Sequence, residues 1–275
     1  MRTNLLSLAA VCLTTVAATA AGPIDWQPSK TDAWHGFTRH HFTLEGRPCW
    51  VSVPPTPRPG NPWVWCMIFP TAFDTRTGVV PLVKDGFHYI HMDVGNTYGA
   101  PAALDQMDAF YRHIVAKGLS PRGALLGVSR GGLYVYRFAA RNPERVTCIY
   151  GDAPVCDFKS WPGQKSAKGW EEVKRLYGFK DDAEALAFQG NPVDSLEPLA
   201  KAGIPLIHVV GDADTVVPVA DNTAVIEQRY KALGGSVTVF HKPGVGHHPH
   251  GLDDPAPVAG LIKAYAARAA GGCRK

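Results

Sequence analysis

What this sequence has little of excludes several classes of protein. Lys and Arg form no block of five or more and the net charge is only +4, so we expect no nucleic-acid partner. No CxxC pair and no Cys/His cluster has the spacing of a structural zinc site. Charged residues make up only 19% of the 275 residues and hydrophobic residues 45%, which excludes a disordered chain and a coiled coil. The chain also has no internal repeat, and these observations together indicate a globular protein.

Long apolar runs are also absent, apart from one at the start of the chain. One positive charge at Arg2 precedes an apolar stretch from Leu5 to Val16, and the small residues Ala18 and Ala20 follow at cleavage-site spacing. This pattern predicts a secretory signal peptide over residues 1–20 and a secreted or periplasmic protein. A membrane anchor is the alternative, but the run is shorter than the ~20 residues of a span. We expect no membrane contact after cleavage.

An odd number of cysteines follows the predicted cleavage site. An exported chain can form disulfides, but five cysteines leave at least one thiol without a partner inside the chain. Two pairs have suitable positions, one flanking a strand end and one on neighbouring strands, and spacing does not decide between them. Cys148 and Cys156 flank the strand end, Cys49 and Cys66 lie on the neighbouring strands, and Cys273 is the fifth cysteine.

Strand-like and helix-like segments alternate along most of the chain. Continuous apolar strands separated by helices indicate a mostly parallel sheet with helices on both faces, and the short turns near the start indicate antiparallel opening strands. The predicted strands are 37–42, 49–53, 63–69, 88–94, 124–128, 146–150, 205–210 and 236–240. The predicted helices are 102–116, 132–141, 220–233 and 255–269.

Residues 155–200 break this rhythm. The segment contains Trp161, Trp170 and two short helix candidates at 171–177 and 182–188. We interpret it as a small cap inserted into a single domain that spans residues 21–275. The cap lacks a long amphipathic helix, which argues against a lipase.

A serine lies in the pattern Gly127-Val128-Ser129-Arg130-Gly131, between a predicted strand and a predicted helix. Glycine is needed on both sides because a serine on so sharp a turn brings its neighbours against the strand and helix. The backbone N–H of Arg130 is then placed for an oxyanion hole. The alternative is a glycine-rich turn with no catalytic role. Whether an acid and a base follow Ser129 in the sequence distinguishes the two interpretations.

An acid and a base follow Ser129 in the order that such a site requires. Two aspartates follow the strand at 205–210, and we favour Asp214 over Asp212 because an aspartate directly after a strand-ending glycine often caps a turn. His247 follows a Gly-x-Gly turn and is the favoured base. His248 and His250 are neighbours that could line the pocket. Three close histidines can also bind zinc, but only if their rings converge, and we expect no metal.

Together these motifs resemble the α/β-hydrolase superfamily over residues 35–269. The nucleophile motif matches at Ser129, the G-x-x-D acid motif ends at Asp214, and the G-H base motif ends at His247. The resemblance implies a second oxyanion donor in the loop after the third predicted strand. That loop departs from the His-Gly-Gly-Gly form of many lipases, and a backbone N–H of Thr71 or Ala72 is the candidate.

The Ser129-Arg130 pair also resembles secreted carbohydrate esterases, including those that act on uronic-acid esters. The Arg130 guanidinium suits a carboxylate in the pocket, and a buried salt bridge to Asp152 is the equal alternative. Polar or aromatic side chains predicted near the same mouth are Asn96, Tyr98, Asp152, Trp161, Trp170 and His248.

The sequence therefore predicts a secreted serine esterase that removes methyl or acetyl groups from a polysaccharide or oligosaccharide, with pectin-like uronate esters favoured. No cofactor and no obligate protein partner are expected. One alternative is a small serine peptidase of the prolyl-oligopeptidase type, although such enzymes usually carry an additional large domain. The other is a non-catalytic carbohydrate-binding protein on the same fold.

Overall fold

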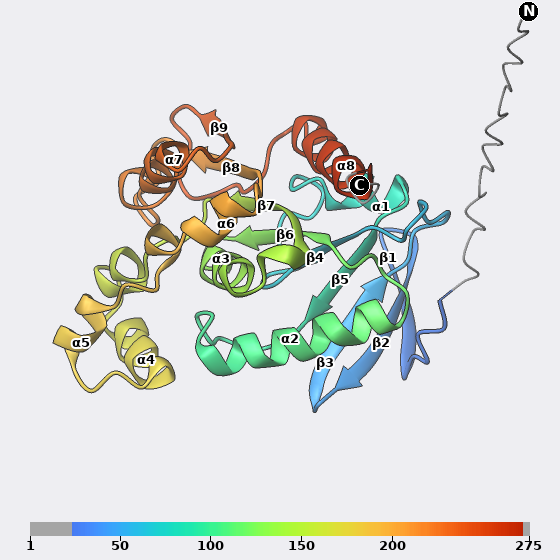
Figure 1. Cartoon of the computed structure of the whole chain (residues 1–275), viewed down its shortest axis with the longest axis horizontal. Coiled ribbons are helices and arrows are strands. Elements are labelled where there is room, and N and C mark those ends of the chain that lie inside the picture. The colour runs from blue at the N-terminus through green and yellow to red at the C-terminus, as the bar shows by residue number, and fades with distance from the viewer. Residues whose placement is uncertain (1–23, 272–275) are drawn as a thin grey trace, which may run out of the picture.

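A single sheet of nine strands runs through the part of the chain that the computed structural model describes, residues 24–271 (Figure 1). The predicted signal peptide and Cys273 lie outside these residues. Neighbouring strands follow the order β1-β2-β3-β5-β4-β6-β7-β8-β9. The strands are β1 (Lys30–Trp34), β2 (Phe37–Leu44), β3 (Arg47–Ser52), β4 (Trp63–Cys66), β5 (His88–Met92), β6 (Gly123–Val128), β7 (Val146–Asp152), β8 (Leu206–Gly211) and β9 (Val237–Lys242).

The sheet changes from antiparallel to parallel along its width, as the sequence predicts. Strands β1, β2, β3 and β5 pair in antiparallel fashion, and every pair from β5 across to β9 is parallel. Strand β1 was not predicted as a strand. It pairs with β2 through the two-residue turn His35-Gly36, in which both residues have positive φ, as a tight hairpin requires.

Helices cover both faces of the sheet, which confirms the predicted architecture. Because successive strand residues point to opposite faces, β4 sends Trp63 and Trp65 into one core and Val64 and Cys66 into the other. Helices α1 and α8 lie on one side of the sheet and α2 on the other (Figure 1). Outside residues 155–200 the helices are α1 (Val79–Lys84), α2 (Pro101–Ala116), α3 (Gly131–Arg141), α7 (Thr223–Ala232) and α8 (Ala256–Gly271).

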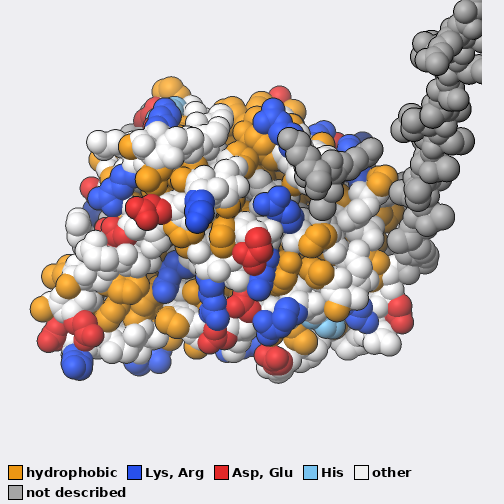
Figure 2. Space-filling model, viewed as in Figure 1, with side chains coloured by type: hydrophobic (Ala, Val, Ile, Leu, Met, Phe, Trp, Pro, Cys, Tyr) orange, Lys and Arg blue, Asp and Glu red, His pale blue; other side chains and the backbone are white. Residues whose placement is uncertain are grey.

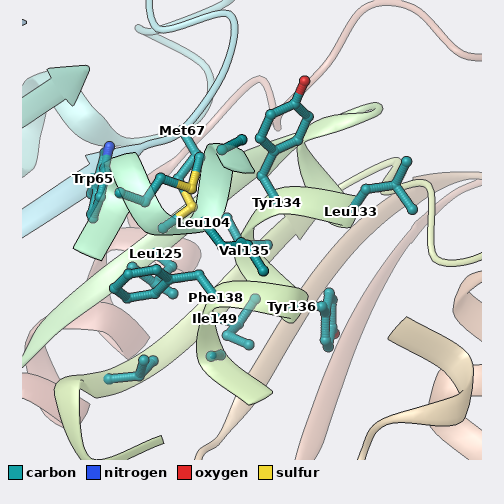
Figure 3. Packing of buried hydrophobic residues seen from close by; sticks show 14 of the residues in the cluster. Trp65, Met67, Leu104, Leu125, Leu133, Tyr134, Val135, Tyr136, Phe138 and Ile149 are labelled. Atoms are coloured by element: carbon teal, nitrogen blue, oxygen red, sulfur yellow. The ribbon is translucent and has the colours of Figure 1, made fainter. Parts of the chain in front are cut away.

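The larger core packs the helices α2 and α3 against the middle of the sheet. Figure 3 shows Trp65, Leu125 and Phe138 gathered there. The Trp65 ring meets the rings of Phe110 and Phe138 edge-on, at centroid distances of 4.9 and 5.3 Å. Such aromatic pairs add about 0.5–1.5 kcal/mol each to the free energy of burial, so they help to hold β4 against α2 and α3, the helix that follows Ser129.

Two short helices were not predicted, and the strand predicted at 63–69 is shorter than expected. The predicted strand 63–69 ends at Cys66, and at Phe69 the chain turns with a positive φ of 59°. Helix α1 was not predicted, since its β-branched residues and Pro81 have low helix propensity. Its buried side chains Val79, Leu82 and Val83 pack in the same core as α8, and this tertiary contact stabilises the helix. Helix α6 (Glu197–Lys201) was also missed.

Residues 155–200 lie between β7 and β8 and include helices α4 (Ala167–Tyr177) and α5 (Asp182–Ala187) and the start of α6, and we refer to this segment as the cap. In Figure 1, α4 and α5 lie to one side of the sheet. Arg137 of α3 joins this cap to the body. Its guanidinium lies 4.7 Å from the centroid of the Tyr177 ring and donates to the carbonyl of Gly99 at 2.9 Å. The cap is therefore anchored to the helix that follows the candidate nucleophile.

The four cysteines within residues 24–271 are buried and free. Cys49 and Cys66 belong to opposite cores, and so do Cys156 and Cys148. Because the sheet separates the members of each pair, neither disulfide that the sequence spacing allowed can form without moving the backbone.

Charged side chains of both signs lie on the face of the molecule that Figure 2 shows. On the face shown in Figure 2, Lys and Arg side chains alternate with Asp and Glu and with small apolar areas. No helix within residues 24–271 has both the length and the apolar character that crossing a membrane requires.

Two buried histidines make the fold sensitive to acid. His208 of β8 lies between the Tyr136 hydroxyl at 2.7 Å and the Thr223 hydroxyl at 2.9 Å, and burial lowers its pKa to about 3. Burial lowers the pKa of His88 to about 4. An unfolded imidazole titrates near 6.5, so below that pH the unfolded state binds protons that the folded state excludes. The stability that both rings contribute is complete above pH 6.5 and is lost as the pH falls toward 3–4.

We expect the free energy of unfolding to fall by about 2–3 kcal/mol for each ring between pH 7 and 4.5. Urea denaturation at the two pH values measures this loss. The variant His208→Gln, which does not titrate, is expected to show a smaller difference between them. Equal free energies of unfolding at pH 7 and 4.5 in the wild type would contradict the prediction.

Candidate active site

Ser129 occupies a strained turn between β6 and α3. Its φ is +52°, a left-handed conformation that costs a non-glycine residue of order 1–3 kcal/mol. Two backbone hydrogen bonds hold the turn, from Ser129 N–H to the Asp152 carbonyl and from Val155 N–H to the Ser129 carbonyl, both at 2.8 Å. A Cβ on Gly127 would lie 2.7 Å from the Gly131 carbonyl oxygen. The glycine before the serine is therefore a steric requirement of the turn.

The structure brings Ser129, His247 and Asp214 together. His247 Nε2 lies 3.0 Å from Ser129 Oγ, and His247 Nδ1 lies 2.7 Å from Asp214 Oδ2. The side chains of His247 and Asp214 are 8% and 1% exposed. The other Asp214 oxygen accepts the N–H groups of Val216 and Val217 at 2.8 and 2.9 Å. Both carboxylate oxygens are thus held in place, and the imidazole is oriented toward the serine.

The negative charge on Asp214 is stabilised although the carboxylate is buried. Burial by itself would raise the pKa of this carboxyl group, but hydrogen bonds from His247 and from the N–H groups of Val217 and Val216 outweigh it, and the pKa lies below its usual value. An ionised Asp214 can stabilise a protonated His247. That is the state a general base reaches after taking the proton of a nucleophilic hydroxyl.

Asp212 lies elsewhere, although it follows the same strand. It pairs with His241 at 2.7 Å, and both side chains are well exposed. Gly211 explains how the loop reaches the serine, since a Cβ there would lie 2.2 Å from the carbonyl oxygen of Gly246. The absence of a side chain lets the turn before His247 pack against the end of β8.

Two backbone N–H groups near Ser129 are free to meet an oxyanion. Among the described residues, no group accepts the N–H of Arg130 or that of Thr71. Ala72 is different, because its N–H donates to the Phe69 carbonyl at 3.0 Å. The sequence left Thr71 and Ala72 as alternatives. The turn engages Ala72 and therefore argues against it as a donor.

The guanidinium of Arg130 lies between two aromatic rings. Its central carbon is 4.9 Å from the centroid of the Phe69 ring and 5.7 Å from that of Tyr98. Its Nε has no hydrogen-bond partner, and no carboxylate within residues 24–271 lies within 4.0 Å of it. This arrangement leaves a positively charged group free at the mouth of the site.

Asp152 is wrongly predicted, both as a substrate contact and as the partner of Arg130. Its side chain is fully buried, and its oxygens bind His250 Nδ1 at 2.7 Å, the Gly251 N–H at 2.8 Å and the Tyr150 hydroxyl at 2.5 Å. The strand end that carries Asp152 points inward beneath the histidine segment. A carboxylate with these partners holds that segment in place and does not reach a substrate.

A cleft of about 390 Å³ lies beside Arg130, and Asn96 lines it together with residues 67–71. The amide nitrogen of Asn96 donates to Glu172 of α4 at 3.2 Å, which leaves its oxygen available. The Tyr98 hydroxyl donates to the same carboxylate at 3.2 Å. Because Tyr98 is only 3% exposed, its predicted direct contact with substrate is wrong. Tyr98 instead contacts the Arg130 guanidinium, at 5.7 Å from its ring centroid, and the half-buried Trp161, at a centroid distance of 5.9 Å.

Trp170 packs inside the cap and not at the mouth. Its indole N–H donates to Asp182 at 3.0 Å, and its ring meets Phe158 at 5.9 Å. It belongs to a cluster of aromatic side chains that joins α4 to α5, so its predicted contact with substrate is replaced by a packing role. The sequence also missed Phe69 and Glu172. Neither carried a signal, because a positive φ and a contact across 76 residues are invisible in the sequence.

His248 is exposed and lies beside the catalytic candidate His247, at a ring-centroid distance of 4.9 Å. Its ring stacks on Phe73 at 5.7 Å. The rings of His247, His248 and His250 lie 4.7–4.9 Å apart. The three imidazoles therefore converge, contrary to the expectation from sequence.

Comparison with known proteins places this geometry in a wider context. Residues 92–257, which include the three residues of the candidate triad, match the sequence profile of the Prolyl oligopeptidase family. Among curated proteins there is no match.

Solved structures share the fold at low sequence identity. An S-formylglutathione hydrolase from Agrobacterium tumefaciens is 17% identical with a TM-score of 0.61, and the match covers 88% of this chain and 98% of that one. A bifunctional GH43-CE protein from Bacteroides eggerthii is 20% identical with a TM-score of 0.66, covering 83% and 38%. A puromycin-hydrolysing peptidase from Mycobacterium tuberculosis is 16% identical with a TM-score of 0.65, covering 85% and 39%. These likenesses confirm the α/β-hydrolase fold, and this chain spans about two fifths of the last two proteins.

Proposed function

We propose that this chain, which belongs to the prolyl oligopeptidase family of serine hydrolases, is a secreted esterase. It removes methyl or acetyl groups from a polysaccharide, and uronate methyl esters are the favoured substrates. Ser129 attacks the ester carbonyl while His247 takes its proton and Asp214 stabilises the resulting imidazolium. The N–H groups of Arg130 and Thr71 hold the oxyanion. His247 then protonates the leaving alcohol, and water attacks the acyl-enzyme by the same route.

The free guanidinium of Arg130 is the observation that carries this proposal. A cation without a carboxylate partner, stacked between Phe69 and Tyr98, presents a planar fork of donors to an incoming group. Uronate polymers offer such groups, because the acid product and any unesterified neighbour are carboxylates. The half-buried Trp161 and the free amide oxygen of Asn96 add an aromatic face and an acceptor suited to a sugar.

A peptidase is the second candidate function, and family membership is the observation that favours it. Both reactions use the same acyl-enzyme chemistry, so the triad does not discriminate between them. The bond that is cleaved does, because an ester releases an alcohol and a peptide releases an amine.

A panel of substrates with the protein from residue 21 onward tests the proposal. It contains methyl-esterified pectin, acetylated xylan, p-nitrophenyl acetate and a proline-containing peptide anilide, with methanol, acetate and aniline quantified. We expect methanol release that disappears in Ser129→Ala. Acetate release alone would favour a deacetylase, and aniline release alone would favour the peptidase. Retained binding of pectin by an inactive wild type would instead favour a carbohydrate-binding protein.

Loss of the Arg130 side chain is expected to affect charged substrates selectively. In Arg130→Leu the backbone N–H stays in the oxyanion hole, while a charge-assisted hydrogen bond of about 1.5–3 kcal/mol is lost. We expect kcat/KM for a uronate methyl ester flanked by free uronates to fall roughly 10- to 100-fold. The rate on p-nitrophenyl acetate, which has no carboxylate, provides the control and is expected to change little. An equal loss on both substrates would refute a role in recognition.

A further inference from the structure

Three histidine rings meet in the proposed site, and one of them, His247, contacts Ser129. The ring planes of His247, His248 and His250 are inclined at 70°, 80° and 89° to one another. One ligating nitrogen from each ring lies within 4.8 Å of the other two. Mutually inclined imidazoles with convergent nitrogens are the arrangement that a tetrahedral metal ion requires of three histidine ligands.

Two of the three rings are already oriented as metal ligands are. His247 Nδ1 is bound to Asp214 and His250 Nδ1 to Asp152, each at 2.7 Å. Both carboxylates are buried. A carboxylate on Nδ1 directs Nε2 outward and raises its basicity, which is the common support of histidine ligands in zinc sites. The His250 ring has no role in the proposed reaction, and no described group binds its Nε2 atom.

Hydrogen bonds from Lys242 and Arg76 hold the backbone of the segment that carries the histidines. Lys242 donates to the carbonyl groups of Pro249 and Gly251 at 2.6 and 3.2 Å, and Arg76 donates to the carbonyl of His250 at 2.8 Å. His248 is exposed, and neither ring nitrogen has a hydrogen-bond partner among the described residues. Two ligands are therefore fixed by carboxylates, and the His248 ring has only ring contacts, among them its stacking on Phe73.

We propose that His247, His248 and His250 bind a divalent transition-metal ion, with zinc as the preferred ion, and that bound zinc inhibits hydrolysis reversibly. Zinc–nitrogen bonds of about 2.0–2.1 Å place the three nitrogens about 3.4 Å apart, so the cluster closes by up to about 1.4 Å, mainly through His248. Water or Ser129 Oγ supplies the fourth ligand. Binding does not depend on the proposed function. Inhibition does, because it follows from occupying the Nε2 lone pair that would take the proton of Ser129.

Direct zinc binding tests the site without any turnover. Isothermal titration of the metal-free protein with zinc chloride is expected to show one ion per chain. His248→Ala is expected to weaken binding at least tenfold, and His248→Gln, which keeps the size and polarity of the side chain, is expected to weaken it similarly. His241→Ala, a change at an exposed histidine bound to Asp212, is the matched control and is expected to bind as the wild type does. Absence of stoichiometric zinc in the wild type, or equal affinity in His248→Ala, would overturn the proposal.

Two further readouts separate binding from inhibition. Cobalt(II) added to the metal-free protein is expected to give the intense visible bands of a tetrahedral site, and these bands should weaken in His248→Ala. Zinc is expected to suppress ester hydrolysis at the concentrations at which it binds, and a chelator should restore the rate. Zinc binding with unchanged hydrolysis would refute the inhibitory role. A wild type inactive on every ester would refute the proposed function alone, because the titration stands without it.

Discussion

Ser129→Ala is expected to lower kcat on any ester substrate by roughly 10⁴- to 10⁶-fold, with little change in KM. The hydroxyl is the group placed 3.0 Å from His247 Nε2, and no other described side chain hydroxyl shares that contact. Alanine tolerates the positive φ of 52° no worse than serine, and the two backbone hydrogen bonds of the turn remain. The fold is therefore expected to survive, and initial rates with p-nitrophenyl acetate measure the loss.

Ser236→Ala provides the matched control for this prediction. Ser236 is exposed next to β9, and its side chain forms no hydrogen bond with the described residues. We expect its activity to be within twofold of the wild type. If Ser129→Ala kept more than a hundredth of the wild-type rate while folding normally, the nucleophile would have to be another residue.

Asp214→Asn is expected to lower kcat by about 10⁴-fold, the effect of imposing the wrong tautomer on a catalytic histidine. The Asp214 oxygen that accepts the Val216 and Val217 N–H groups fixes the orientation of the new amide. Its oxygen stays on those two donors, so its NH₂ group faces His247 Nδ1. That ring nitrogen then has to accept, its proton moves to Nε2, and Nε2 can no longer take a proton from Ser129.

Asp212→Asn is the control, since Asp212 follows the same strand but pairs with the exposed His241. We expect it to change kcat less than twofold. The rate of covalent modification by a fluorophosphonate reagent should fall in Asp214→Asn in parallel with kcat, because both depend on the same general base. A large loss in Asp212→Asn with normal activity in Asp214→Asn would reverse the assignment of the acid.

Local patterns allowed much of the architecture to be predicted. The continuous apolar residues of β4, β6 and β8 reflect the burial of both faces of a parallel sheet. The pattern failed where tertiary contacts override propensity. Helix α1 forms from residues with little tendency to be helical because α8 covers its apolar face. Strand β1 is too polar to be recognised and depends on its hairpin partner.

The difference between local pattern and tertiary contact also applies to the side chains around the site. Asp152, Tyr98 and Trp170 follow strands or lie in the cap, and their positions in the sequence do not show which way they point. Asp152 turns inward to His250, Tyr98 lies under Arg130, and Trp170 packs on Phe158. Only the packing of elements far apart in the chain decided which of these groups face the cleft.

The sequence by itself determined the elements of this protein that depend on local chemistry: a strand-to-helix turn whose glycines expose Ser129, a loop with an aspartate after a buried strand, and a histidine after a Gly-x-Gly turn. The tertiary structure decided what depends on distance. It joined Asp214 and not Asp212 to His247, left Arg130 without a carboxylate, and gathered three histidine rings at one point. A residue's type limits its chemistry, but pairing requires atoms within about 3 Å, and folding alone sets those separations.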